Sequence, residues 1–194
     1  MKRLSKWFYL GSTVGVPFIG IVLIVIALAF LVLSGILYNL SVTLSDIDIG
    51  VGFACSLLIL LGCAAVLYGV GIWYVLLYKA WEVIQDNNAS TTPGKAVGFL
   101  FIPAYNFYWI FRVWWGFARD YNRYVARYSL KAPKMKEGLF LAFCILSICS
   151  SVLSLPVTFI ANTYLSYPAA VLSLIIFALT ANQTIDGVNA LLAR

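Results

Sequence analysis

Four basic residues give this chain its clearest potential for chemistry. They recur at spacings of seven, four and four residues, which places them on one face of a helix with 3.6 residues per turn. A guanidinium group offers several coplanar N–H donors and binds phosphate oxygens well. The pattern therefore predicts contact with phosphate groups, above all those of anionic lipids. The four residues are Arg112, Arg119, Arg123 and Arg127.

The opposite face of the same predicted helix is apolar and aromatic. A basic face against an aromatic face is typical of a helix that lies in the membrane interface, and tryptophan side chains anchor such helices at headgroup level. The aromatic face carries Phe107, Ile110, Phe111, Trp114, Phe117, Tyr121 and Val125. The candidate lipid- or partner-binding residues are Lys95, Trp109, Arg112, Trp114, Trp115, Arg119, Arg123 and Arg127.

A shorter helix is expected just before this one. Thr92 is suited to the N-cap and Pro93 to the first helical position. Pro103 lacks a backbone N–H, and it disfavours helical geometry at the residue before it. The sequence therefore predicts a helix pair over about 92–102 and 107–128.

The break between the two helices defines a second candidate site. Asn106 is the expected cap of the second helix. Helices that are broken at membrane depth tend to line cavities, because their unpaired backbone groups cannot face lipid. The residues of the break are Pro103, Tyr105 and Asn106.

The carboxylates form a weaker set. Glu82 and Asp86 share a helix face, and Asp120 lies two residues before Asn122, so either pair offers acid–base groups. The chain contains no histidine, and no nucleophile–base pair, phosphate loop or haem signature accompanies these residues. The sequence predicts no catalytic residue, metal or cofactor.

Two further groups of residues have plain structural interpretations. Asp46 and Asp48 lie in a short predicted loop over 41–50 that offers no third metal ligand. The cysteines have no CxxC spacing and lie in apolar runs, where they are expected to be small buried hydrophobic residues. They are Cys55, Cys63, Cys144 and Cys149.

Composition places the chain in a membrane. Hydrophobic residues make up 63% and charged residues 10% of the sequence, and soluble domains are nearer a quarter charged. The uncharged runs predict an all-α membrane protein, a single domain over 1–194, with four transmembrane helices over about 14–39, 51–78, 138–161 and 169–189. The net charge of +6 lies in segments that flank these runs. It therefore favours an anionic lipid surface rather than nucleic acid as the partner.

Charge also predicts the topology. If 96–118 crossed the membrane, the basic segment from Arg119 to Lys136 would lie opposite Lys79 and Lys95. If that stretch instead dips in and returns, four spans place every lysine and arginine on one side. The positive-inside rule favours the second arrangement. Both termini are then cytoplasmic, and the helix pair is re-entrant or interfacial on the cytoplasmic side.

The stretch from Trp81 to Asn122 carries three motif blocks. They read W-x-x-I-Q-D, then T-T-P-G-K-A-V-G-F-L-F-I-P-x-x-N-x-Y-W-I-F, then G-F-A-x-D-x-N. This pattern resembles a family of uncharacterised bacterial multi-pass membrane proteins that has no assigned activity. The resemblance implies a location in the bacterial inner membrane and implies no mechanism.

Three functions remain open from the residues. The favoured one is a non-catalytic membrane protein whose basic and aromatic cytoplasmic hairpin binds anionic lipid or a membrane-protein partner. The alternative is a small oligomeric channel or transporter whose pathway is lined by the break at Pro103–Asn106. An intramembrane enzyme is the third. Gly11 and Gly15 offer a small-residue face for a homo-oligomer.

Overall fold

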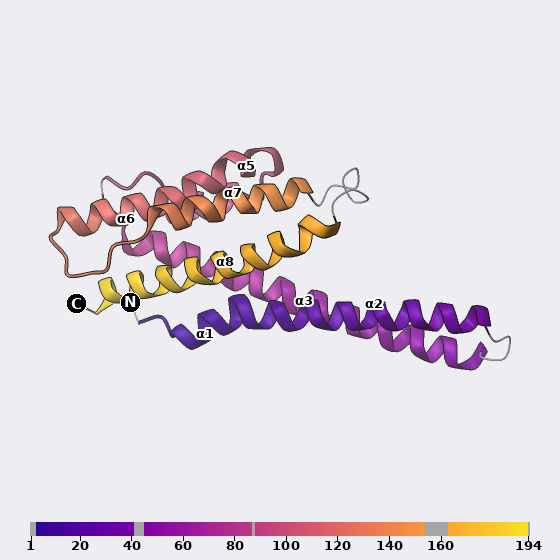
Figure 1. Cartoon of the computed structure of the whole chain (residues 1–194). Coiled ribbons are helices and arrows are strands. Elements are labelled where there is room, and N and C mark those ends of the chain that lie inside the picture. The colour runs from indigo at the N-terminus through magenta and orange to yellow at the C-terminus, as the bar shows by residue number, and fades with distance from the viewer. Residues whose placement is uncertain (1–2, 41–44, 87, 154–162, 194) are drawn as a thin grey trace. The chain divides into compact units, whose positions relative to one another are not determined.

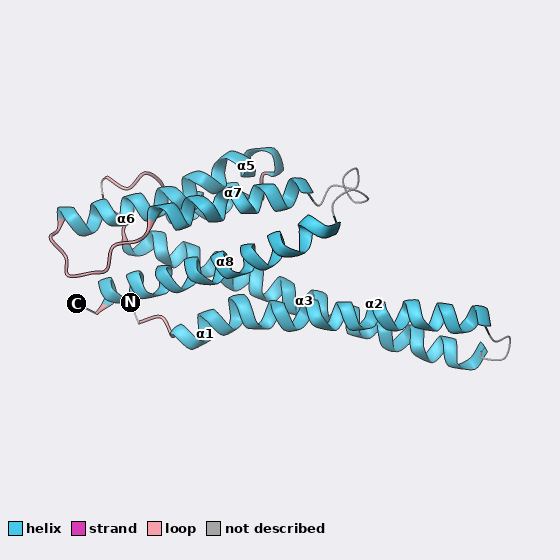
Figure 2. Cartoon of the chain, viewed as in Figure 1, coloured by secondary structure: helices cyan, strands magenta, loops and turns pink. Residues whose placement is uncertain are grey.

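The computed structural model describes residues 3–40, 45–86, 88–153 and 163–193. All regular structure in these ranges is helical, which confirms the predicted all-α class (Figure 2). Contacts divide the chain into two compact units, one formed by Met1–Leu10 with Tyr74–Arg194 and the other by Gly11–Trp73. We call the first the bundle and the second the α2–α3 unit.

Within the described ranges, three stretches of helix are long and apolar enough to cross a membrane. They are Lys6–Ser34, Gly50–Val83 and Val171–Leu192, and they coincide with three of the four predicted spans. Their length and composition support a membrane-embedded protein. The fourth predicted span begins as the shorter apolar helix α7 (Glu137–Leu153), and its last part, from residue 154, lies outside the described residues.

Two helices begin earlier than predicted. Helix α3 (Ser45–Val83) includes residues that were expected to form a loop, and α8 (Thr163–Leu192) starts six residues before its predicted span.

The α2–α3 unit is an antiparallel pair of helices, α2 (Val16–Leu40) and the first part of α3 (Figure 1). Glycines allow the two backbones to approach closely. A Cβ atom on Gly20 would lie 2.6 Å from the carbonyl oxygen of Gly62, and one on Gly62 would meet Gly20 in the same way. Most of the large apolar side chains of this unit are exposed, as expected for helices that face lipid.

The bundle contains the end of α3 and all later helices, together with α1 (Lys6–Leu10). Its core is aromatic, and Trp81, Phe117 and Tyr121 are each fully buried. The N-terminal segment packs on α8, because Leu4 and Asn189 exchange two hydrogen bonds of 2.7 and 2.9 Å and Lys6 pairs with Asp186 at 2.9 Å. Both chain ends and the segment 128–136 lie at the same end of the bundle (Figure 1).

The predicted helix pair is present, and its second helix begins earlier than expected. The first arm is α4 (Pro93–Gly98), which continues as one 3-10 turn, η2 (Phe99–Phe101). The second arm starts as α5 (Pro103–Ile110), so Pro103 is the first helical residue and Asn106 is inside the helix. Proline suits this position because the first turn needs no N–H from it. The prediction that Asn106 caps the helix is therefore wrong.

A wide turn interrupts the second arm. Helix α5 continues through the π turn η3 (Phe111–Trp115) into α6 (Gly116–Arg127), and the N–H of Gly116 donates to the carbonyl of Phe111. Side chains of neighbouring helices also donate to carbonyls here. The indole of Trp81 bonds to Val113 at 3.3 Å, and the thiol of Cys144 to Ile110 at 3.4 Å. We call α4 to α6 the hairpin.

Candidate functional site

Two of the predicted tryptophan anchors lie in the protein core. Trp114 is 2% exposed and packs edge-on against Phe143 of α7, with ring centroids 5.7 Å apart. Trp109 is 7% exposed and donates its indole N–H to the carbonyl of Ala96 at 3.2 Å. These side chains join helices to one another, so neither inserts into the membrane interface as predicted. Most of the aromatic face of the second arm packs on protein, since Trp114, Phe117, Tyr121 and Val125 are buried, whereas Phe107 is exposed.

Trp115 is the one predicted tryptophan that stays partly exposed. The guanidinium group of Arg119 lies over its indole, with the guanidinium carbon 4.9 Å from the ring centroid. Arg123 and Arg127, in contrast, contact carboxylates. Arg123 lies 3.6 Å from Asp120, and Arg127 pairs with Asp86. Each of these two arginines therefore has part of its charge balanced within the protein.

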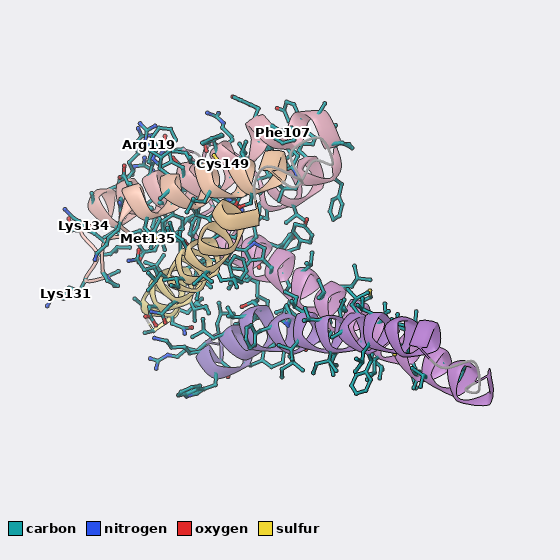
Figure 3. All side chains as sticks on the ribbon, turned by 45° about the vertical axis from the view of Figure 1, so that its right-hand side comes forward. Phe107, Arg119, Lys131, Lys134, Met135 and Cys149 are labelled. Carbon is teal, nitrogen blue, oxygen red and sulfur yellow. The ribbon has the colours of Figure 1, made fainter. Side chains whose placement is uncertain are left out.

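Basic residues gather toward one end of the bundle. Arg119 lies on α6, while Lys131 and Lys134 lie in the segment after it, and Figure 3 shows all three on the same side of the bundle. Phe107 lies toward the opposite end of the hairpin in the same view. We call the region around Arg119, Lys131 and Lys134 the basic end. It comprises Arg119, Arg123, Arg127, Lys131, Lys134 and Lys136.

A cavity of about 580 Å³ opens between the two arms of the hairpin, and we call it the hairpin cavity. One wall is the loop that leads into α4, and the other is α5 with the start of the wide turn. Its lining combines two cations with an aromatic wall. The lining residues are Gln85, Asp86, Ala89, Ser90, Thr91, Thr92, Lys95, Phe99, Tyr105, Tyr108, Trp109 and Arg112.

Lys95 and Arg112 carry the positive charge of this cavity. They come from opposite arms, and neither lies within ion-pair distance of a carboxylate among the residues that the structure describes. Asp86, the single carboxylate in the lining, pairs with Arg127 outside the cavity. The hairpin cavity therefore attracts anions.

The wide turn explains why Arg112 lies apart from the other arginines. A π turn holds one residue more than an α turn, which rotates the residues before it by about a quarter turn relative to those after it. The single basic stripe predicted from a uniform helical period is consequently split. Arg112 lines the hairpin cavity, whereas Arg119 and Arg123 do not.

Polar residues between α3 and α4 hold the cavity wall in place, and the sequence did not single them out for this role. Gln85 donates to the carbonyls of Trp81 and Thr91, both at 3.0 Å. The N–H of Ser90 donates to Asp120 at 2.9 Å. The sequence did contain a signal, because Gln85 belongs to the first motif block and Asp120 to the third. Only the fold shows that both residues bond to the loop before α4.

The same contacts bear on the carboxylates considered for acid–base chemistry. The side chains of Asp86 and Asp120 are 12% and 10% exposed, and each holds an arginine and a backbone N–H. Asn122, two residues further on, bonds to both backbone groups of Met135. Within the described ranges, no cluster of three histidine, cysteine, aspartate or glutamate side chains forms that could hold a metal ion. These residues have a structural explanation.

Two buried polar atoms have no hydrogen-bond partner among the described residues. They are the hydroxyl oxygen of Thr91, which lines the hairpin cavity, and the side-chain carbonyl oxygen of Asn106. Of the predicted break, Tyr105 lines the cavity, while Pro103 is exposed and outside it. The alternative of a pathway along the whole break stays a prediction.

The comparisons with known proteins give no match: no family model, no curated protein and no solved structure is similar enough to count. The resemblance carried by the three motif blocks therefore stays a prediction.

Proposed function

We propose that this chain is a non-catalytic, four-span membrane protein whose basic end binds anionic lipid at the cytoplasmic surface, with the hairpin re-entering the membrane from that side. The observation that carries the proposal is the gathering of cations at one end of the bundle. Arg119, Lys131 and Lys134 lie on the same side of the bundle, and Phe107 at the tip of the hairpin lies toward the opposite end of the hairpin (Figure 3).

The hairpin tip supports re-entry into the membrane. Phe101, Phe107 and Tyr108 are each more than half exposed, which would be unfavourable in water and is expected in hydrocarbon. The hairpin is helical from Pro93 to Arg127 apart from the short break at Ile102, and a helical backbone is what an embedded segment requires. Its second arm packs along α7, which favours a hairpin that dips into the membrane over one that lies flat on it.

Helix α7 supplies the fourth span. It packs along α8, it is apolar after Glu137, and its first residue follows the basic segment 128–136 directly. With four spans and a re-entrant hairpin, both termini and every lysine and arginine lie on one side, as the positive-inside rule favours. The cytoplasmic side is then the side of the basic end.

Thiol labelling tests this topology. In a variant without its natural cysteines, we expect Lys134→Cys to react with an impermeant thiol reagent in inverted membrane vesicles and to be protected in intact cells. Phe107→Cys should react slowly in both preparations, because the hydrocarbon core excludes the charged reagent. Labelling of Lys134→Cys in intact cells would overturn the orientation. Fast labelling of Phe107→Cys would place the tip in water and overturn re-entry.

Lipid retention tests the basic end. We expect Arg119→Gln with Arg123→Gln to weaken the association of phosphatidylglycerol by about 2 kcal/mol, roughly 30-fold, because each cation near an anionic surface contributes about 1 kcal/mol. The measurement is the number of lipids retained by the purified protein in native mass spectrometry. The charge-preserving pair Arg119→Lys with Arg123→Lys is the control. Equal retention in the glutamine and lysine pairs would contradict lipid binding at this end.

A further inference from the structure

The hairpin cavity has the features of a binding site for one defined ligand, separate from the general attraction of the basic end. Its volume of about 580 Å³ lies within the usual range for small-molecule sites, about 300–1,000 Å³. Its polar groups come from the loop before α4, from α4 and from the wide turn, so several elements converge on one space. From these features we infer a ligand that is anionic at one end and apolar along the rest.

The charged end of the ligand follows from three side chains. Lys95 and Arg112 present cations from opposite arms, and the described residues supply no carboxylate to either. Thr91 is only 7% exposed and its hydroxyl has no partner in the described structure. A buried hydroxyl without a partner is unfavourable, and a ligand oxygen would satisfy it. Two cations and one hydroxyl suit an oxyanion with several acceptor oxygens, such as a phosphate group.

The apolar end of the ligand follows from the aromatic wall. Tyr105 stacks on Trp109 with ring centroids 5.4 Å apart, and Phe99 packs edge-on against Trp109 at 4.9 Å. The indole N–H of Trp109 is occupied by the carbonyl of Ala96, which fixes the ring and leaves an apolar surface toward the cavity. Tyr108 continues this wall toward the exposed tip of the hairpin.

We propose that the hairpin cavity binds the phosphate group of a single anionic phospholipid between Lys95, Arg112 and Thr91, with the start of its acyl region along Tyr105 and Trp109. The choice of a lipid rests on the proposed function, in which the hairpin enters the membrane and brings the cavity to the lipid headgroups. The phosphate chemistry of the cavity does not depend on that placement.

Native mass spectrometry of the full chain, titrated with phosphatidylglycerol, tests the proposal. We expect one lipid to bind with an affinity at least about tenfold above that of later lipids or of phosphatidylcholine. Lys95→Gln with Arg112→Gln should weaken this first site by at least about tenfold, because two charge-assisted contacts are lost. Arg3→Gln with Lys79→Gln removes the same charge outside both the hairpin cavity and the basic end, and this matched control should leave the first site unchanged. Unchanged first-site affinity in the Lys95 and Arg112 pair would overturn the proposal.

Thr91→Val gives an independent readout. Removing a buried hydroxyl that has no protein partner should leave the melting temperature of the lipid-free protein unchanged or higher, while the first lipid binds about three- to tenfold more weakly. A residue with a purely structural role would show the opposite pattern. A lower melting temperature with unchanged lipid affinity would overturn the assignment of Thr91 to the ligand.

Competition with a soluble phosphate ester tells whether the ligand of the cavity is a lipid or a free phosphate compound. Glycerol 3-phosphate should displace phosphatidylglycerol only at a large excess, because it lacks the apolar part. Displacement at equal concentration would overturn a lipid as the ligand. The thiol-labelling experiment reports membrane placement without lipid titration. If labelling refuted re-entry while the Lys95 and Arg112 pair still abolished first-site binding, the proposed function would fail and the phosphate site would stand.

Discussion

Replacing Trp81 by alanine is expected to destabilise the bundle by about 3–5 kcal/mol, the usual loss when a large buried aromatic side chain is truncated. Trp81 is fully buried, lies edge-on to Phe117 at 5.6 Å between ring centroids, and donates to the carbonyl of Val113. The substitution removes a large core volume and leaves that carbonyl, at the wide turn, without its indole donor. The measurement is unfolding of the purified protein in mixed micelles with increasing denaturing detergent.

Two control variants separate these contributions. Trp81→Phe keeps most of the ring and loses the hydrogen bond, so we expect a loss of about 1–2 kcal/mol. Trp7→Ala removes a tryptophan that is 89% exposed, and its effect on bundle stability should be below about 0.5 kcal/mol. If Trp81→Ala were no more destabilising than Trp7→Ala, the packing of α3 on the hairpin would be wrong.

Three of the four spans could be predicted because they depend on a simple property of the sequence. A long uncharged apolar run can be accommodated by a membrane only as a helix, since every backbone group must bond within its own segment. The runs that contain Ile24 and Leu60 needed no tertiary information. The hairpin could be predicted for a similar reason. Pro103 has no backbone N–H to donate to a helical hydrogen bond, so it must mark a helix start or a break.

The environment of the aromatic face could not be predicted from its pattern. In a soluble protein an apolar stripe points to the core, but in a membrane both the core and the lipid are apolar. Phe117 and Tyr121 satisfy the pattern equally well in either place, and the structure buries both against neighbouring helices. The protein core and the lipid differ in the neighbour that the side chain contacts, which is Phe140 for Phe117 and Gly187 for Tyr121. The helical period of the sequence carries no information about that neighbour.

The cavity was predicted only in part, for two physical reasons. The uniform period used to align the arginines assumes an unbroken α-helix, and one wide turn is enough to move Arg112 out of register with Arg119. The loop residues gave no periodic signal at all. In the sequence, Ser90 and Thr91 simply precede the N-cap Thr92. They become part of the cavity wall only because Gln85 and Asp120 bond to the loop and hold it against the second arm.

A loss of about 2–3 kcal/mol is expected for Asn122→Leu, because this side chain satisfies the backbone at the turn into α7. Its amide accepts from the N–H of Met135 at 2.8 Å and donates to the carbonyl of Met135 at 2.9 Å and to Glu137 at 3.1 Å. Met135 is itself buried, so leucine would leave both of its backbone groups without these partners, and an unpaired buried group costs about 1–3 kcal/mol.

The consequence of that loss should be local as well as global, and this separates it from a simple packing defect. With its anchor removed, the segment that carries Lys131 and Lys134 should be cleaved by trypsin at least several-fold faster while the rest of the bundle stays protected, because partly released segments open at low free energy. Asn122→Asp keeps one acceptor and loses the donor, so it should fall between the wild type and Asn122→Leu. The neighbouring Arg123→Ala, at an exposed position, should leave both stability and cleavage unchanged. If cleavage in Asn122→Leu matched that of Arg123→Ala, Asn122 would not be the residue that fixes the basic end to α7. Other contacts would then have to hold Lys131 and Lys134 on the same side of the bundle as Arg119.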